Sequence, residues 1–332
     1  MRSSRNCNCN RDGDPRCERD RICDHDRDRN SNCERGCSRD YGCSRGHDRD
    51  GSRSRRRMRV DRTLGYVLLV TFGVFFFMPL LYMITTSLNP DEISILRNMS
   101  SLGAFVPQPV GLRNYINIFN RMPFGRFIFN SVFIVSTTVV AGLLVNSMAA
   151  YSLARFSWRG RGALVTSIVA LMIIPFEAIA VPLLLLTNKF GWLNTYHVQI
   201  IPFIANPFYI YLFYQFFLKF PYALEEAARI DGAGWFGIYW RVVLPLSKPV
   251  LSSVAILHFL THWGSFLWPL MVTRGPEYRP LTVAMQVFFG GQFPRLWGEI
   301  MAFATMMTVP VLVLFAALQS WFVASVARTG IK

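Results

Sequence analysis

Residues 220–249 read FPYALEEAARIDGAGWFGIYWRVVLPLSKP, and they form the one long polar interval between apolar segments that also has the pattern of structured helices. Pro221 suits the first turn of a helix, and the acidic pair Glu225–Glu226 favours the N-terminal half of that helix. Gly232 or Gly234 can end it, because glycine adopts the left-handed conformation of a helix C-terminus without strain. The stretch therefore predicts a short surface helix of roughly ten residues.

The residues after Trp235 predict a second short helix, which Pro245 would stop because proline cannot continue the hydrogen-bond ladder. Its apolar side chains recur at i, i+3, i+4 and i+7 and would share one face. They are Phe236, Tyr239, Trp240 and Val243. Two short helices joined at glycines make a compact docking element. A loop lying on the membrane surface is the alternative that physics alone leaves open.

The spacing inside this stretch is specific. Glu226-Ala227-Ala228 is followed after three residues by Gly232, then after nine residues by Val242, one residue, and Leu244-Pro245. This pattern resembles the EAA loop of ABC importer permeases, with valine where isoleucine is usual. The flanking sequences LEEAARIDGA and LPLSKP most resemble the sugar-transporting branch, which is related to the maltose permease subunits.

The resemblance implies that the loop inserts into a groove on a separate ATP-hydrolysing subunit. The residues expected to make that contact are Glu226, Ala227, Ala228, Asp231, Gly232, Ala233, Leu244 and Pro245. If Gly232 ends the first helix in a left-handed cap, a β-branched residue there would redirect the chain. Glu225 is expected on the more solvent-accessible flank, where a change to glutamine would be mild. A pairing of Glu226 with Arg229 at i+3 is the structural alternative to a docking role.

Six long intervals contain no Lys, Arg, Asp or Glu, apart from one glutamate. They are residues 63–90, 127–154, 162–188, 190–218, 249–273 and 300–327. Each exceeds the roughly 20 residues that a helix needs to cross the hydrocarbon core. The sequence thus predicts an all-α polytopic membrane protein with six transmembrane helices, in which Asn130 and Asn146 make interhelical hydrogen bonds. The resemblance implies the type I ABC importer permease (MetI-like) fold for residues 58–332, with a cytoplasmic coupling loop at 220–249.

Glu177 is the glutamate inside these intervals. A carboxylate near mid-span costs about 2.5 to 3.5 kcal/mol on insertion scales, so it rarely faces lipid. Pro175 and Pro182 flank it, and both tend to break a helix, so this span is expected to be irregular and to line a cavity. Two interpretations stay open: Glu177 is a pathway or gate residue, or its carboxylate is paired with a polar group or a freed backbone donor.

The first 57 residues have a composition of their own, rich in Arg, Asp, Ser, Asn, Gly and Cys and nearly free of aliphatic residues. Such a segment buries too little apolar surface to offset the entropy of ordering, so residues 1–57 are expected to be disordered. All seven cysteines lie here, but they form no paired CxxC framework, and we expect no metal site. An upstream extension of a chain that begins at Met58 is the alternative to a genuine tail.

Basic residues predict the side of each loop. Arg155, Arg159 and Arg161 lie in one short connection without an acid between them, which favours the cytoplasm. The run AYSLARF at 150–156 also resembles the importer family. With six spans, this arrangement puts the 220–249 loop and both termini on the cytoplasmic side, and the resemblance implies that the membrane is a bacterial plasma (inner) membrane.

Catalytic signatures are absent from the sequence. No lysine follows a glycine, so no Walker A motif exists, and neither H-E-x-x-H nor G-x-S-x-G occurs. We expect a transport subunit without a cofactor, and nothing in the chain has the pattern of nucleic-acid binding. The resemblance implies two ATP-binding subunits, a second homologous permease subunit and an extracytoplasmic solute-binding protein, with a sugar as solute. The alternatives are a permease for a polyamine, phosphate or another small polar solute, a gradient-driven carrier, and a purely structural membrane subunit.

Overall fold

The computed structural model describes residues 50–106, 109–291 and 295–329. Within these ranges the chain contains helices and no strand, so the all-α prediction is confirmed. The helices are α1 (Asp50–Ser87), α2 (Glu92–Asn98), η1 (Leu102–Phe105), α3 (Arg113–Arg121), α4 (Phe124–Arg155), α5 (Arg161–Leu171), α6 (Phe176–Lys189), α7 (Tyr196–Ile204), α8 (Pro207–Leu218), α9 (Tyr222–Ile230), α10 (Trp235–Ile238), η2 (Tyr239–Val243), α11 (Leu244–Leu246), α12 (Lys248–Trp263), α13 (Leu267–Val272), α14 (Leu281–Phe289) and α15 (Trp297–Thr329).

The chain divides into two compact units, residues 1–66 and 67–332. The described part of the first unit is the beginning of α1, which starts at Asp50. Residues 50–57 of the predicted disordered tail are therefore helical, and the arginines in them are good helix formers. The rest of the tail, with all seven cysteines, lies outside the described residues.

Four helical segments in the described part of the chain are long and apolar enough to cross a membrane by themselves. They are Thr63–Ser87, Phe124–Arg155, Tyr196–Leu218 and Trp297–Ala317. Two further pairs qualify when both helices count as one broken span: α5 with α6, bent by 102°, and the segment Trp235–Leu246 with α12, bent by 78°. The six predicted spans are reached only with these broken pairs. Pro175 immediately precedes α6, so the expected irregularity of the third span is confirmed.

The predicted fifth span, residues 249–273, is not one helix. α12 ends at Trp263, where the N–H of Gly264 closes its last turn, and the short α13 follows. At 16 residues, α12 is about 24 Å long, which is less than the hydrocarbon thickness. The helix paired with α12 in the bent pair, Trp235–Leu246, precedes α12 and lies within the predicted loop 220–249.

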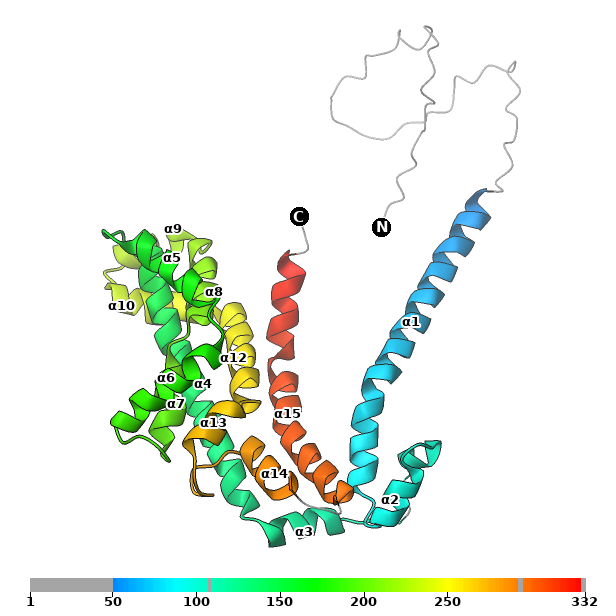
Figure 1. Ribbon diagram of the computed structural model, residues 1–332. Helices are drawn as coiled ribbons and strands as arrows, with labels where there is room; N and C mark the ends of the chain where they lie inside the picture. Colours follow the sequence, from blue (N-terminus) through cyan, green and yellow to red (C-terminus); the bar gives the residue numbers. More distant parts are fainter. Residues whose placement is uncertain (1–49, 107–108, 292–294, 330–332) are drawn as a thin grey trace, which may run out of the picture. The chain divides into compact units, whose positions relative to one another are not determined.

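α4 is the central helix of the second unit. It packs against α7, α8, α12 and α14 (Figure 1). The amide of Asn146 donates to the carbonyl of Ile204 over 2.9 Å and accepts from the backbone N–H of Asn206 over 2.8 Å, which fixes the junction of α7 and α8 against α4. Asn130, near the other end, accepts from the hydroxyl of Tyr196 over 2.8 Å. Both predicted interhelical hydrogen-bonding residues are thus confirmed.

Candidate functional site

Residues 220–249, the predicted docking element, include α9 and turn at Gly232. Gly232 has φ +82°, so the predicted left-handed cap is confirmed. The N–H of Ala233 then donates to the carbonyl of Ala228 over 3.0 Å, the bond that closes a helix ended by glycine. This cap sets the angle at which the chain leaves α9 and enters α10.

The second helix of the docking element differs from its prediction, because Pro245 does not stop it. The chain passes from α10 into the π-helical turn η2 and continues through α11 to Ser247. In an α-helix the ring of Pro245 would meet the carbonyl of Arg241, four residues earlier. In the π-turn the N–H of Leu244 donates to Tyr239, five residues back, and this wider turn accommodates the proline.

The predicted apolar face of that helix is also split. Tyr239 and Val243 are buried, whereas Phe236 and Trp240 are 68% and 48% exposed. The rings of Phe236 and Trp240 stack on each other on the outside of the element. The wider turn changes the helical phase after Ile238, so the 3.6-residue period no longer assigns the faces.

The prediction that Glu225 lies on the solvent-accessible flank is wrong, because its side chain is fully buried. Its Oε1 accepts from Nε of Arg155 over 2.6 Å, and its Oε2 accepts from the hydroxyl of Tyr151 over 3.2 Å. Removing a carboxylate from water is energetically costly, so a buried carboxylate is normally paired with a positive charge. Here both oxygens of Glu225 have partners. The flank of α9 that carries Glu225 therefore faces the protein.

The end of α4 supplies the matching surface. Ser147, Tyr151 and Arg155 lie at i, i+4 and i+8 and so form one stripe along the helix, here called the α4 stripe. The hydroxyl of Ser147 is 2.7 Å from that of Tyr239. A second guanidinium nitrogen of Arg155 donates to the carbonyl of Phe220 over 2.9 Å. Each member of the stripe thus contacts the docking element.

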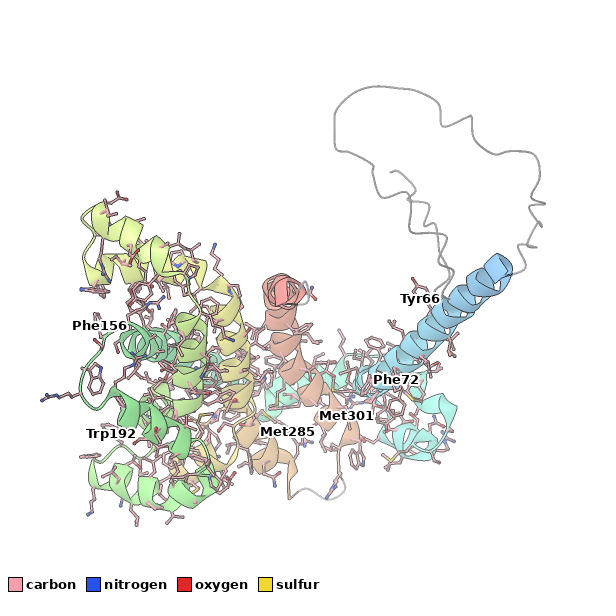
Figure 2. All side chains as sticks on the ribbon, turned by 90° about the horizontal axis from the view of Figure 1, so that it is seen from above. Tyr66, Phe72, Phe156, Trp192, Met285 and Met301 are labelled. Carbon is pink, nitrogen blue, oxygen red and sulfur yellow. The ribbon has the colours of Figure 1, made fainter. Side chains whose placement is uncertain are left out.

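Aromatic rings complete this attachment. The Arg155 guanidinium lies 4.6 Å from the ring centre of Tyr222, and the Tyr151 ring packs on Phe217 and Tyr239. Figure 2 shows Phe156 at the end of α4, where its ring meets that of Trp235 at 4.8 Å. The α4 end and the docking element therefore form one packed body.

The residues predicted to dock lie on the outer side of that body. Five are exposed and three are half-buried. The exposed ones are Glu226, Ala227, Asp231, Gly232 and Pro245, and the half-buried ones are Ala228, Ala233 and Leu244. Arg229 stacks 3.8 Å over the ring of Trp235, within the docking element. The structure thus brings the predicted residues together on one element, with their side chains largely accessible.

Large apolar side chains surround these residues. Ile230 is 87% exposed beside the glycine cap, and Leu224, Trp235, Phe236 and Trp240 are each more than 40% exposed. Exposed apolar residues in a cluster mark interaction surfaces. The 3.6-residue period placed Phe236 and Trp240 on the buried face, so it did not identify them as part of this exposed cluster. The π-turn instead leaves both side chains exposed.

Glu177 lies in the first turn of α6, directly after the break, and its side chain is exposed. A cavity of about 330 Å³ adjoins this break and is lined by residues of α5, α6, α7 and α8, among them Phe176, but Glu177 is not part of the lining. Its position suits the N-terminus of α6, where a carboxylate is favoured by the helix dipole. The pathway role stays a prediction.

Among the described residues, no group of three or more His, Cys, Asp or Glu side chains could hold a metal ion. The candidate site is a protein surface, formed by a glycine-capped helix, a π-turn and a cluster of exposed apolar residues. It is attached to the end of a membrane-spanning helix by a buried ion pair.

These features describe a helical membrane protein with an exposed candidate docking surface, and comparison with known proteins gives its class. Residues 139–328, more than half of the chain, match the family described as "Binding-protein-dependent transport system inner membrane component". The chain belongs to this family. It is a multi-pass inner-membrane protein and a transport subunit.

Individual relatives are permeases of carbohydrate ABC transporters. The arabinooligosaccharides transport system permease protein AraQ of Halalkalibacterium halodurans is 34% identical over 274 residues, which cover 81% of this chain and 95% of the relative. The trehalose/maltose transport system permease protein MalG of Thermococcus litoralis is 27% identical over 281 residues, covering 82% and 97%. A crystal structure of a bacterial ABC transporter that imports the acidic polysaccharide alginate matches with a TM-score of 0.70 and 25% identity, covering 80% and 98%. The expected importer-permease fold is confirmed.

Proposed function

We propose that this chain is the membrane-spanning permease subunit of an ATP-driven importer and that it translocates a sugar delivered by a solute-binding protein. The relatives that support this substrate class are named for arabinooligosaccharides, diacetylchitobiose, and trehalose or maltose. The alginate importer has also been crystallised with its oligosaccharide-bound periplasmic protein. The partners are therefore an extracytoplasmic solute-binding protein, a second homologous permease subunit and two ATP-binding subunits.

The observation that carries the proposal is the contrast within α9. Glu225 is fully buried against α4, whereas the next residue, Glu226, and the glycine cap are exposed beside Ile230. One flank of the helix is thus fixed to the permease and the other is free for a partner. ATP is hydrolysed by that partner, since this sequence has no Walker A motif.

The membrane topology that we propose follows from the contact between Glu225 and α4. The ion pair of Arg155 and Glu225 requires the Arg155–Arg161 connection and the docking element to be on one side of the membrane. The basic residues of the connection favour the cytoplasm for both, and hence for the two termini. In a chain without the tail cysteines, Ser157→Cys and Lys248→Cys should resist an impermeant thiol reagent in intact cells. Ser100→Cys, exposed between the first two spans, should react, and labelling of Ser157→Cys or Lys248→Cys from outside would contradict this topology.

An exposed residue tests docking without disturbing the fold. Ile230→Asp should weaken co-purification of the ATP-hydrolysing subunit by about tenfold, the effect of losing one central interface residue. Ile93→Asp is the matched control, because Ile93 is 74% exposed and lies on α2, outside the docking element. Equal association of the two variants would contradict the assignment of the docking surface.

The solute is tested in vesicles that contain the assembled importer and its binding protein. Sugars should stimulate ATP hydrolysis, whereas phosphate and polyamines should not. Stimulation by phosphate or a polyamine would favour the alternative importer class. Sugar uptake by this chain without any ATP-hydrolysing subunit would favour a gradient-driven carrier.

We also propose that Glu177 lies along the solute pathway. Its exposure at the break between α5 and α6 supports this role, because the broken span offers non-helical backbone beside a cavity. Glu177→Gln should change the rate of solute transport while leaving assembly with the ATP-hydrolysing subunit intact. A wild-type transport rate would remove Glu177 from the pathway.

A further inference from the structure

The two ends of α4 are both fixed by polar contacts. At one end, Arg155 and Tyr151 bind the carboxylate of Glu225, which is fully buried. At the other end, Asn130 donates to the carbonyls of Pro276, Glu277 and Arg279, and Ser131 accepts from the N–H of Leu281 over 2.7 Å. The second set holds the segment that leads into α14.

These contacts connect segments that are far apart in the sequence. Glu225 follows Arg155 by 70 residues, and Leu281 follows Ser131 by 150. The docking element is joined covalently to α8 and α12 only, through the turn at Lys219–Pro221 and the bend at Ser247. α8 and α12 also pack on α4, and the α4 stripe with the rings around it adds a direct contact between the docking element and α4.

α4 has the length that this connection needs. Its 32 residues extend for about 48 Å, which exceeds the roughly 30 Å of the hydrocarbon core. α4 contains no proline, and helices without proline rarely kink sharply. α4 is thus long enough to join Arg155 on one side of a membrane to Asn130 on the other.

We propose that α4 acts as a lever between the docking element and the segment before α14, and that Arg155 and Tyr151 are the positioning residues that attach the lever to the docking element. This inference rests on the proposed function, because it assigns to these residues the transfer of ATP-driven motion. The guanidinium suits the role, since its planar fork binds Glu225 and the carbonyl of Phe220 at the same time. Tyr151 donates to the second carboxylate oxygen and fixes the orientation of the carboxylate.

The test separates attachment from folding. Arg155→Met or Glu225→Leu alone leaves one buried charge without its partner and should reduce assembly. The double variant Arg155→Met/Glu225→Leu removes both charges and keeps apolar packing, so it should assemble with the ATP-hydrolysing subunit at the wild-type level. It should nevertheless hydrolyse about fivefold or more ATP per solute transported, the lower end of the usual range of coupling effects. Arg159→Met is the matched control, because Arg159 is exposed in the same connection.

A double variant that assembles and transports with the wild-type ratio of ATP to solute would overturn the lever, because the pair would then serve folding alone. If the double variant does not assemble, Tyr151→Phe decides, since this change removes only the hydroxyl that binds Glu225. A raised ratio in Tyr151→Phe supports the proposal, and a wild-type ratio overturns it. Failure of the proposed function is distinguishable, because the wild-type chain itself would then not bind an ATP-hydrolysing subunit.

Discussion

Glu92 accepts a hydrogen bond of 2.8 Å from the backbone N–H of Gly298 at its Oε1, and its Oε2 accepts one of 3.0 Å from Trp297. These N–H groups belong to the first turn of α15, where an α-helix leaves its donors unpaired. A carboxylate from α2, more than 200 positions earlier in the chain, therefore caps the last helix. The negative charge also suits the positive end of the helix dipole.

Removing this cap should destabilise the protein. Glu92→Ala is expected to lower stability by about 1 to 2 kcal/mol, the usual effect of losing a helix cap. Glu92→Gln should cost less, because one acceptor oxygen remains. The measurement is thermal unfolding of the purified permease in detergent. Glu277→Ala, which removes an exposed carboxylate, is the control and should leave the unfolding temperature unchanged.

The same carboxylate gives a pH dependence. Burial raises the pKa of Glu92 above its ordinary value, although the two backbone hydrogen bonds oppose the shift. The folded state then binds the proton more tightly than the unfolded state, so the contribution of Glu92 to stability is largest at low pH and falls as the pH rises through the raised pKa. The loss in Glu92→Ala should thus be larger at about pH 4 than at about pH 8. The opposite trend would contradict the raised pKa.

Gly232→Val should abolish uptake and weaken association with the ATP-hydrolysing subunit while the membrane spans remain intact. A Cβ at Gly232 would meet no atom within 4 Å, so the cost comes from the positive φ alone and is on the order of 1 kcal/mol or more. Gly234→Val is the matched control, since Gly234 has open space too but a φ of −71°. Co-purification measures association with the ATP-hydrolysing subunit, and reconstituted vesicles measure uptake, for each of the two variants. Equal behaviour of the two variants would show that the left-handed cap is not required.

Glu225→Gln should be severe, and Glu226→Gln should be mild for stability. Breaking one partner of a buried ion pair costs about 3 to 5 kcal/mol, because Arg155 would keep its charge in the interior. Glu226 is exposed, so its neutral variant should unfold at the wild-type temperature and lose only affinity for the partner subunit. Thermal unfolding of the two purified variants gives the comparison. A stable Glu225→Gln protein would contradict the buried pair.

Gly142→Ala should disturb the packing of α4 on α12. A Cβ at Gly142 would overlap the ring of His258, which is fully buried. Such overpacking typically costs about 1 to 3 kcal/mol. Gly125→Ala in the same helix has open space and should be tolerated. Combining Gly142→Ala with His258→Ala should recover part of the lost stability in thermal unfolding, and no recovery would contradict the overlap with His258.

The sequence predicted the features that depend on local patterns. Long uncharged intervals predicted the spans, and the glycine at 232 predicted the cap, because glycine is favoured in the left-handed conformation. The burial of Glu225 was not predictable in this way, since it depends on Arg155, which comes 70 residues earlier. One signal existed: Arg155 ends a span of uncharged residues with no acid nearby in sequence, and such a cation needs a distant partner.

The second helix of the docking element shows a different limit. Proline was expected to end it, and the 3.6-residue period was expected to assign its faces. Both predictions were wrong at the same place, because the π-turn at Tyr239–Val243 changes the number of residues per turn. A π-turn has no simple sequence signature, although a proline soon after an aromatic run is compatible with one.

The exposed apolar cluster around Ile230 and Phe236 affects how much of this protein accumulates in the cell. A copy without its partner presents these side chains to water, with Ile230 87% and Phe236 68% exposed. Exposed apolar surface of this kind promotes aggregation and recognition by chaperones and proteases. An unassembled copy should thus be short-lived, and its abundance should follow synthesis of the partner subunit. The docking surface would in this way also set the ratio in which the two chains accumulate.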